Sequence, residues 1–153
     1  MDLPAAYRTP ESAARLHLIA ESHQRLLGEP LVTPSPDIAT ALWSAPEVIL
    51  AHGTEADPRF FFANRAALAR FEASFDQMIG MPSRLSAEAP NRTERQALLD
   101  RVSRDGFIAD YAGVRISLKG KRFRIEQATV WNLIDAEGKV HGQAAAFSRW
   151  TEL

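Results

Sequence analysis

The sequence predicts an α+β fold in which short helices gather on one face of a five-stranded antiparallel sheet. Three observations support this fold class. Helical spacing of apolar residues dominates the start of the chain, a strand pair with short capped helices follows, and the last third alternates strands with tight turns. The order of two helices, two strands, three helices and three strands fits one α+β domain of 153 residues.

The first predicted helix begins after Thr9, which is a suitable N-cap residue. Pro10 suits the first helical position, and Gly28 ends the helix. Its apolar residues fall on one face: Leu16, Ile19, Ala20, Leu26 and Leu27. This apolar stripe predicts that the helix packs on its own domain or pairs with a second copy of the chain.

A Pro-rich stretch at residues 31–37 follows the first helix and is predicted to be a linker. We therefore divide the chain into an N-terminal helix with its linker, residues 1–36, and a main domain, residues 37–153. Asp37 is placed to open a second short helix at residues 38–43.

The middle of the chain predicts a strand pair followed by capped helices. Residues 47–53 and 59–63 are apolar runs separated by turn-forming residues. Asn64 and Ser74 each stand where an N-cap belongs, so a short helix is expected after each of them.

A longer helix is expected to begin at Asn91 or Thr93 and to end at Gly106. Its inward-facing stripe is predicted to contain Ala97, Leu98 and Val102.

Three strands are predicted in the last third, at residues 106–118, 122–135 and 139–150. In the first of them, one face carries Ala112, Val114, Ile116 and Leu118, and the other carries Tyr111, Arg115 and Ser117. In the second, strict alternation places Gln127 on the face of Phe123, Ile125, Thr129 and Trp131.

Composition excludes several function classes. Lys and Arg number 18 against 19 Asp and Glu, a net charge of −1, so no nucleic-acid partner is expected. Residues 115–124 hold five basic residues, which fit either a phosphate contact or a solvated hairpin end. Cysteine is absent, which excludes thiolate chemistry, and the four histidines are not spaced for a metal site. We see no signal peptide and no apolar run of the roughly 20 residues that span a bilayer, so we expect a cytoplasmic protein with no membrane partner.

Several uncommon stretches resemble the MEKHLA domain, a PAS-related family. The stretch FFANRAALARFE, followed by SFDQMIG, is similar to the PAS pattern of a strand and an Asn-capped helix. The sequence segments that resemble the MEKHLA domain, across about residues 40–150, are ILAHGTEADPRFFFAN, MPSRLSAEAPNRTER, GFIADYAGVRIS, RFRIEQATVWNLID and GQAAAFSRW. In plants such domains end homeodomain–leucine zipper transcription factors, whereas this chain resembles the stand-alone bacterial type.

The resemblance implies that residues 37–153 form a PAS-like domain, a five-stranded sheet that cups short helices. Such a cup binds a small molecule inside or a protein partner outside. Haem-binding members place an axial His on the long helix before the last three strands, and flavin photosensors use a reactive Cys; this chain has neither. An unidentified ligand bound without a covalent link, flavin included, stays open, and a homodimer is expected, with the N-terminal helix as one route to it.

The residues expected to line the ligand site are Phe62, Phe71, Arg84, Tyr111, Gln127, Thr129, Trp131 and Gln143. Gln143 lies in the last strand, where flavin sites of PAS-like domains place an amide. Alternatively, Gln127, Thr129 and Gln143 pair across strands or face outward. Arg84 is positioned either for an anionic ligand or for a salt bridge to Glu88 or Glu94.

The leading hypothesis is a PAS-like sensory module that acts through ligand binding and through dimer or partner contacts, without catalysis. The second hypothesis is a protein-interaction domain with a filled core, which is favoured if Gln127 and Gln143 face outward or pair with each other. The third is a small isomerase-like α+β enzyme, for which Asp110, Tyr111 and His141 are the candidate catalytic residues. The MEKHLA-like stretches argue against this third fold.

Overall fold

The computed structural model describes residues 2–153, without the side chains of residues 89–91. The helical segments, with η marking a 3₁₀ turn, are η1 (Ala5–Arg8), α1 (Pro10–Leu27), α2 (Ile38–Ser44), α3 (Arg65–Phe71), α4 (Phe75–Met78), η2 (Ser83–Ser86) and α5 (Ala89–Asp105). The strands are β1 (Val48–His52), β2 (Phe60–Ala63), β3 (Phe107–Ile116), β4 (Arg122–Ile134), β5 (Val140–Phe147) and β6 (Arg149–Glu152). Across residues 2–153, no helix has the length and apolar character needed to cross a bilayer.

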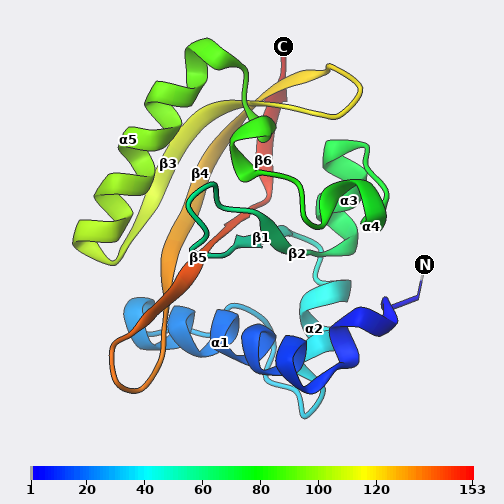
Figure 1. The fold of residues 1–153 in the computed structure, drawn as a ribbon, viewed down its shortest axis with the longest axis vertical. Coiled ribbons are helices and arrows are strands. Elements are labelled where there is room, and N and C mark those ends of the chain that lie inside the picture. Colours follow the sequence, from blue (N-terminus) through cyan, green and yellow to red (C-terminus); the bar gives the residue numbers. More distant parts are fainter. Residues whose placement is uncertain (1) are drawn as a thin grey trace.

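One antiparallel sheet organises the molecule (Figure 1). Its strand order is β2-β1-β5-β4-β3, and β6 pairs with the first part of β4. Only Ser148 separates β5 from β6, so the last predicted strand is present but broken in two. The expected α+β fold, with five predicted strands in one antiparallel sheet, is confirmed.

Helices cover both faces of this sheet. The indole Nε1 of Trp131 donates a hydrogen bond of 3.2 Å to the Ile19 carbonyl in α1. The amide of Asn132, the next residue, donates one of 3.0 Å to the Val102 carbonyl in α5. Because successive residues of a strand point to opposite faces, α1 and α5 lie on opposite sides of the sheet. Figure 1 shows α1 crossing near one end of β4 and β5, with α5 alongside β3.

The apolar stripe of α1 is buried in its own chain. Leu16 and Ile19 are fully buried in the core. Ser22 continues this contact, since its hydroxyl donates to the Ile134 carbonyl and accepts from the Ile134 amide. The helix therefore packs on its own domain, and a homodimer formed through it stays a prediction.

N-caps expected from the sequence begin four helices. The side chains of Thr9, Asp37, Asn64 and Ser74 each accept a backbone N–H from the first turn that follows. Asn64 does more, because its amide group also donates to the carbonyls of Leu42 and Glu47 and its oxygen accepts the Ile49 N–H. This buried residue therefore joins α2, β1 and α3.

The start and the inner stripe predicted for α5 are wrong in part. The helix begins at Ala89, before both Asn91 and Thr93, and its end at Gly106 is as expected. The side chain of Asn91 lies outside the described part of the structure. Ala97 is exposed, whereas Leu98 and Val102 are buried together with Arg95.

A bulge at Gln127 overturns the alternation predicted for β4. Gln127 has a φ of +50°, and Glu126 and Gln127 stand opposite Ala112 alone in the register with β3. One extra residue in a strand moves everything beyond it to the other face. Phe123 and Ile125 therefore share the inner face with Val130, while Trp131 turns toward α1.

The polar face of β3 is the buried one. Tyr111, Arg115 and Ser117 are each at most 9% exposed, whereas Leu118 is 38% exposed. The basic hairpin that follows is solvated and ion-paired: Lys121 lies 3.6 Å from Glu72, and Arg122 pairs with Glu88. Of the five basic residues in this segment, Arg115 is turned inward.

Candidate functional site

A cavity of about 60 Å³ lies between the inner face of the sheet and the helices that cover it. We call it the inner cavity, and we call α3, α4, η2 and α5 together the helical cap. Cross-strand register builds its floor, because Leu50, Ala145 and Val130 lie side by side on β1, β5 and β4. The apolar wall is completed by Phe60, Phe71, Leu98, Ile125 and Phe147. Polar side chains reach the same cavity from four elements: His52, Arg95, Tyr111, Arg115 and Gln143.

Gln143 lines the inner cavity and carries a buried acceptor without a partner. Its Nε2 lies 3.2 Å from the Leu99 carbonyl, 3.1 Å from the Ser103 hydroxyl and 3.0 Å from Oδ1 of Asn132. Because the Leu99 carbonyl can only accept, this orientation of the amide is well determined. The opposite atom, Oε1, is buried and has no hydrogen-bond partner. The side chain thus ties α5 to the sheet and leaves one acceptor open.

Tyr111 also lines the inner cavity and carries a second unpartnered group. Its hydroxyl is buried and has no hydrogen-bond partner. Gly113 makes room for it, since a Cβ at that position would lie 2.1 Å from the Tyr111 hydroxyl oxygen. Residues 111 and 113 share one face of β3, so the phenol lies along the strand over the glycine.

His52 adds a third open atom at the end of β1. Its Nδ1 lies 3.0 Å from the Gly53 carbonyl, which assigns the proton to Nδ1 in the neutral ring. Nε2 is then an acceptor, and it is buried without a partner. Burial lowers the pKa of His52, and the nearby positive charge of Arg95 lowers it further. The ring is therefore held neutral at physiological pH.

Two arginines carry positive charge to the inner cavity. Arg95 is 7% exposed, and its Nη2 donates to the Ser83 hydroxyl at 2.6 Å. Arg115 is 9% exposed, and its Nη1 donates to the Val114 carbonyl at 2.9 Å. Burial lowers the pKa of Arg95 to about 10, and the like charge of Arg115 contributes to that shift. Arg95 is therefore still charged at neutral pH.

An open polar cleft adjoins the inner cavity. It has a volume of about 360 Å³ and lies between the β1–β2 loop, η2, α5 and β5. We call it the outer cleft. It shares His52, Arg95, Leu99 and Gln143 with the inner cavity, so these four side chains form the wall between the two spaces.

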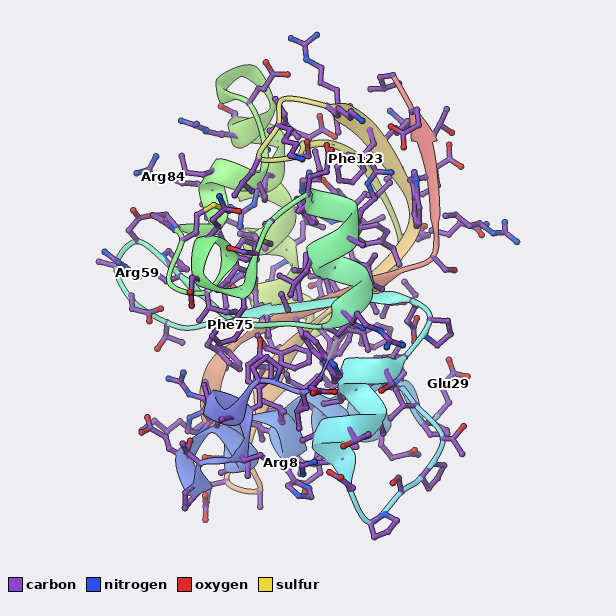
Figure 2. All side chains as sticks on the ribbon, turned by 90° about the vertical axis from the view of Figure 1, so that its right-hand side faces the viewer. Arg8, Glu29, Arg59, Phe75, Arg84 and Phe123 are labelled. Carbon is purple, nitrogen blue, oxygen red and sulfur yellow. The ribbon has the colours of Figure 1, made fainter. Side chains whose placement is uncertain are left out.

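Three of the predicted ligand residues line the inner cavity: Phe71, Tyr111 and Gln143. Arg84 lies in the outer cleft and pairs with Asp57 at 3.2 Å. Figure 2 shows Arg84 and Arg59 at the same outer edge of the molecule. The expected salt bridge from Arg84 to Glu88 or Glu94 is replaced by this pair.

The other four predicted residues lie away from the inner cavity. Phe62 is buried against Tyr7, with ring centroids 4.9 Å apart. Gln127 is exposed and accepts a 2.9 Å hydrogen bond from Arg149. Thr129 and Trp131 follow the bulge and so take the face of the sheet that α1 covers. The reason for these last three placements is the single extra residue in β4.

Sequence reasoning missed three of the cavity's polar residues, and two of them had a signal. Arg95 precedes Leu98 and Val102 at spacings of three and seven residues, which places all three on one helix face. In the strand predicted at residues 106–118, Arg115 lies two and four residues after Gly113 and Tyr111, so the three residues share one face. His52 lies at the end of the strand predicted at residues 47–53, and nothing in the sequence around it indicates a buried nitrogen without a partner.

The candidate catalytic residues do not converge. His141 pairs with Asp135 at 2.8 Å near the far end of β5. Tyr111 stands opposite Ala128, which lies beside the Phe147 end of β5, six residues from His141. Six strand residues span roughly 20 Å. Asp110 is exposed, on the outward side of Tyr111. Among the residues with described side chains, no three His, Cys, Asp or Glu groups are placed to hold a metal ion.

Comparison of the sequence with known proteins identifies the family of this chain. The MEKHLA domain model matches residues 13–152. The homeobox-leucine zipper protein HOX29 of Oryza sativa subsp. japonica is 26% identical over 152 residues, 95% of this chain. The homeobox-leucine zipper protein ATHB-14 of Arabidopsis thaliana is 25% identical over 150 residues, 94% of this chain. This chain spans only 18% of the length of each of these two relatives.

Solved structures of PAS type share the fold. A PAS domain from Colwellia psychrerythraea superposes with a TM-score of 0.61 at 15% identity, covering 75% of this chain and 92% of that one. A light-oxygen-voltage domain studied with a flavin analogue gives a TM-score of 0.60 at 14% identity, covering 76% of this chain and 84% of that one. The architecture is therefore that of PAS and light-oxygen-voltage domains.

Proposed function

This chain belongs to the MEKHLA domain family, and we propose that it works as a PAS-like sensory module that binds a small molecule in the inner cavity. One observation carries the proposal. The Tyr111 hydroxyl, Gln143 Oε1 and His52 Nε2 are buried without partners, and all three residues border this cavity. An unpaired buried polar atom costs about 1–3 kcal/mol, so three around one space favour an occupant that pairs with them.

The size of the inner cavity selects a small occupant. Sites for drug-sized ligands are roughly 300–1,000 Å³, whereas this cavity is about 60 Å³. A flavin ring system does not fit it, and the chain has no Cys for a flavin adduct. The flavin named for the light-oxygen-voltage domain therefore does not carry over to this chain.

The position of the inner cavity supports a signalling mechanism by population shift. Gln143 belongs to the sheet but holds the Leu99 carbonyl and Ser103 of α5. A ligand that forms hydrogen bonds to both Gln143 and Arg95 would favour the arrangement in which α5 packs on the sheet. The readout would be a contact with a partner or with a second copy of the chain. Catalysis has no part in this mechanism.

A pair of Tyr→Phe variants tests the proposal. Tyr111→Phe removes a hydroxyl that has no partner in the ligand-free protein, so the free energy of unfolding should stay the same or rise. Ligand bound by the wild type should be lost or weakened about tenfold, because the hydroxyl is a proposed contact. We would read both from native mass spectrometry of freshly purified protein and from thermal melting with and without the co-purified compound.

Tyr7→Phe is the matched control. The Tyr7 hydroxyl donates to the Ala63 carbonyl at 3.1 Å and accepts from the Ala63 amide at 3.2 Å, away from the inner cavity. This variant should lose about 1–3 kcal/mol of stability and retain the ligand. If wild-type protein carries no bound compound, and a panel of small metabolites never shifts its melting, the inner cavity is not a ligand site.

A further inference from the structure

We infer that the ligand of the inner cavity is a small organic carboxylate whose anionic group is held by Arg95 and Arg115. This inference rests on the proposed function, because it names the chemical class of the molecule that the cavity binds. Neither buried guanidinium forms an ion pair among the described residues, and Asp57, whose charge acts on Arg95, is itself paired with Arg84. An uncharged ligand would leave both guanidinium groups without an ion pair.

Arg95 is a buried charge that the protein leaves incompletely paired. It comes from the inner face of α5, where apolar Leu98 and Val102 are its neighbours along the helix stripe. Among the described residues, its side chain donates a hydrogen bond to the neutral hydroxyl of Ser83. A buried guanidinium normally has a carboxylate or several acceptors, because burial of an unpaired charge is costly. A bound anion would supply that missing partner.

Arg115 places a second positive charge beside the first. Its guanidinium carbon lies 5.3 Å from the centroid of the Tyr111 ring, and its hydrogen-bond acceptor is the neighbouring Val114 carbonyl. Within residues 2–153, the ion pairs present involve neither Arg95 nor Arg115. Two like charges beside one small cavity repel each other. A single anion between them would offset this repulsion and accept a charge-assisted hydrogen bond from each guanidinium.

The rest of the inner cavity favours an organic acid over an inorganic anion. Leu98, Ile125 and Val130 form an apolar wall that suits a short hydrocarbon chain and cannot solvate phosphate oxygens. The Tyr111 hydroxyl can donate to the carboxylate. The Gln143 Oε1 and His52 Nε2 acceptors suit a hydroxyl or amino substituent on the same molecule. The cavity therefore matches a short carboxylic acid that carries a hydrogen-bond donor.

Wild-type protein allows the first test, without any substitution. Isothermal titration calorimetry at fixed ionic strength in chloride would compare propionate, lactate, propionamide and inorganic phosphate. We expect saturable binding of propionate and tighter binding of lactate, which adds a hydroxyl. Propionamide has the same shape as propionate without the charge, so it should bind at least tenfold more weakly. Phosphate should not compete with lactate.

Variants locate the anion contact. Arg95→Gln and Arg115→Gln should each weaken lactate binding by tenfold or more, and the ligand-free proteins should melt no lower than wild type, because each loses an unpaired buried charge. Arg8→Gln is the matched control, since Arg8 pairs with Asp37 on the surface beside α2. It should leave lactate binding unchanged. If either cavity variant fails to fold, the propionate and propionamide comparison still decides the matter.

The outcomes separate this inference from the proposed function. If a neutral or cationic compound co-purifies and Tyr111→Phe loses it, while no carboxylate binds, the sensory function stands and the carboxylate inference is overturned. Binding of phosphate but not of propionate or lactate also overturns it. If no compound co-purifies and no probe binds, both proposals fail together.

Discussion

At the scale of single residues, His52 makes the stability of the ligand-free protein depend on pH. Burial lowers the pKa of its imidazole and Arg95 adds to the effect, while the hydrogen bond to the Gly53 carbonyl and the charge of Glu55 oppose it. The unfolded chain takes up this proton at about pH 6.5, and the folded protein does so only at lower pH. Protonation thus favours unfolding, so the contribution of His52 is complete above about pH 6.5 and is lost as the pH falls below it.

The expected result is a difference in slope between two unfolding curves. Between pH 7.5 and 5.5, the wild-type free energy of unfolding should fall more steeply than that of His52→Gln, which cannot take up the proton. Urea unfolding at several pH values measures both. Parallel curves for the two proteins would show that the folded protein accepts a proton on His52 as readily as the unfolded chain.

The bulge at Gln127 is a feature of the structure that the sequence does not predict. Alternation is a sound rule for β4 up to Ile125, and it fails beyond the bulge. Bulges with a left-handed residue favour Gly or Asn, and a Gln with a φ of +50° carries no such marker. Thr129 and Trp131 were therefore predicted for the wrong face. In β3 the alternation holds from Tyr111 to Ser117, beyond a second register shift between Ile108 and Tyr111. Tyr111 and Gln143 both line the inner cavity.

At the scale of elements, α1 is part of the folded unit. Ile19 is fully buried, and its carbonyl accepts the Trp131 indole N–H from β4. Ile19→Ala should lower the free energy of unfolding by about 2–5 kcal/mol, because it opens a cavity between the helix and the sheet. His17→Ala, on the exposed side of the same helix, should change it by less than about 0.5 kcal/mol.

The same pair of variants tests the proposed dimer through α1. Unfolding at two protein concentrations, with sedimentation of each variant, separates the two roles of the helix. If Ile19→Ala leaves unimolecular stability intact and instead dissociates a dimer, then α1 pairs across subunits and its packing on the sheet contributes little. The division at residue 36 would then mark a real boundary between an interaction helix and the main domain.

Elements with local markers were predicted well, and elements without them were not. Thr9, Asp37, Asn64 and Ser74 are side-chain caps, and the helices that follow them start as predicted. The start of α5 was missed because Glu88 occupies the N-cap position and its side chain makes no capping hydrogen bond. Arg95 was missed for a different reason. Charged residues are usually exposed, so a sequence-based prediction places Arg95 on the surface. Its burial is energetically unfavourable, and such exceptions are expected at functional sites.

At the scale of the whole molecule, the inner cavity lies at the joint between the sheet and the helical cap. The sequence predicts the fold class and the order of the elements along the chain, but not the order of the strands in the sheet, where β5 lies between β1 and β4. The cavity itself depends on how side chains from β1, α5, β3 and β5 meet. No local pattern predicts that an arginine, a tyrosine and a glutamine separated by up to 48 positions will share one space.

This joint predicts a local response to ligand. Among the described side chains of α5, Arg95, Leu98 and Val102 are the buried ones, so one of the three side chains under the helix is a guanidinium without an ion pair. Lactate, or the compound that co-purifies, should supply that partner and hold the helix more firmly on the sheet. Hydrogen–deuterium exchange should then slow in α5 more than in α1, which is anchored by Leu16 and Ile19 in either state. The Arg95→Gln variant should lose this selective protection. Equal slowing of α1 and α5 would mean that ligand only stabilises the fold as a whole, and the shift of the helical cap would have to be abandoned as the signalling step.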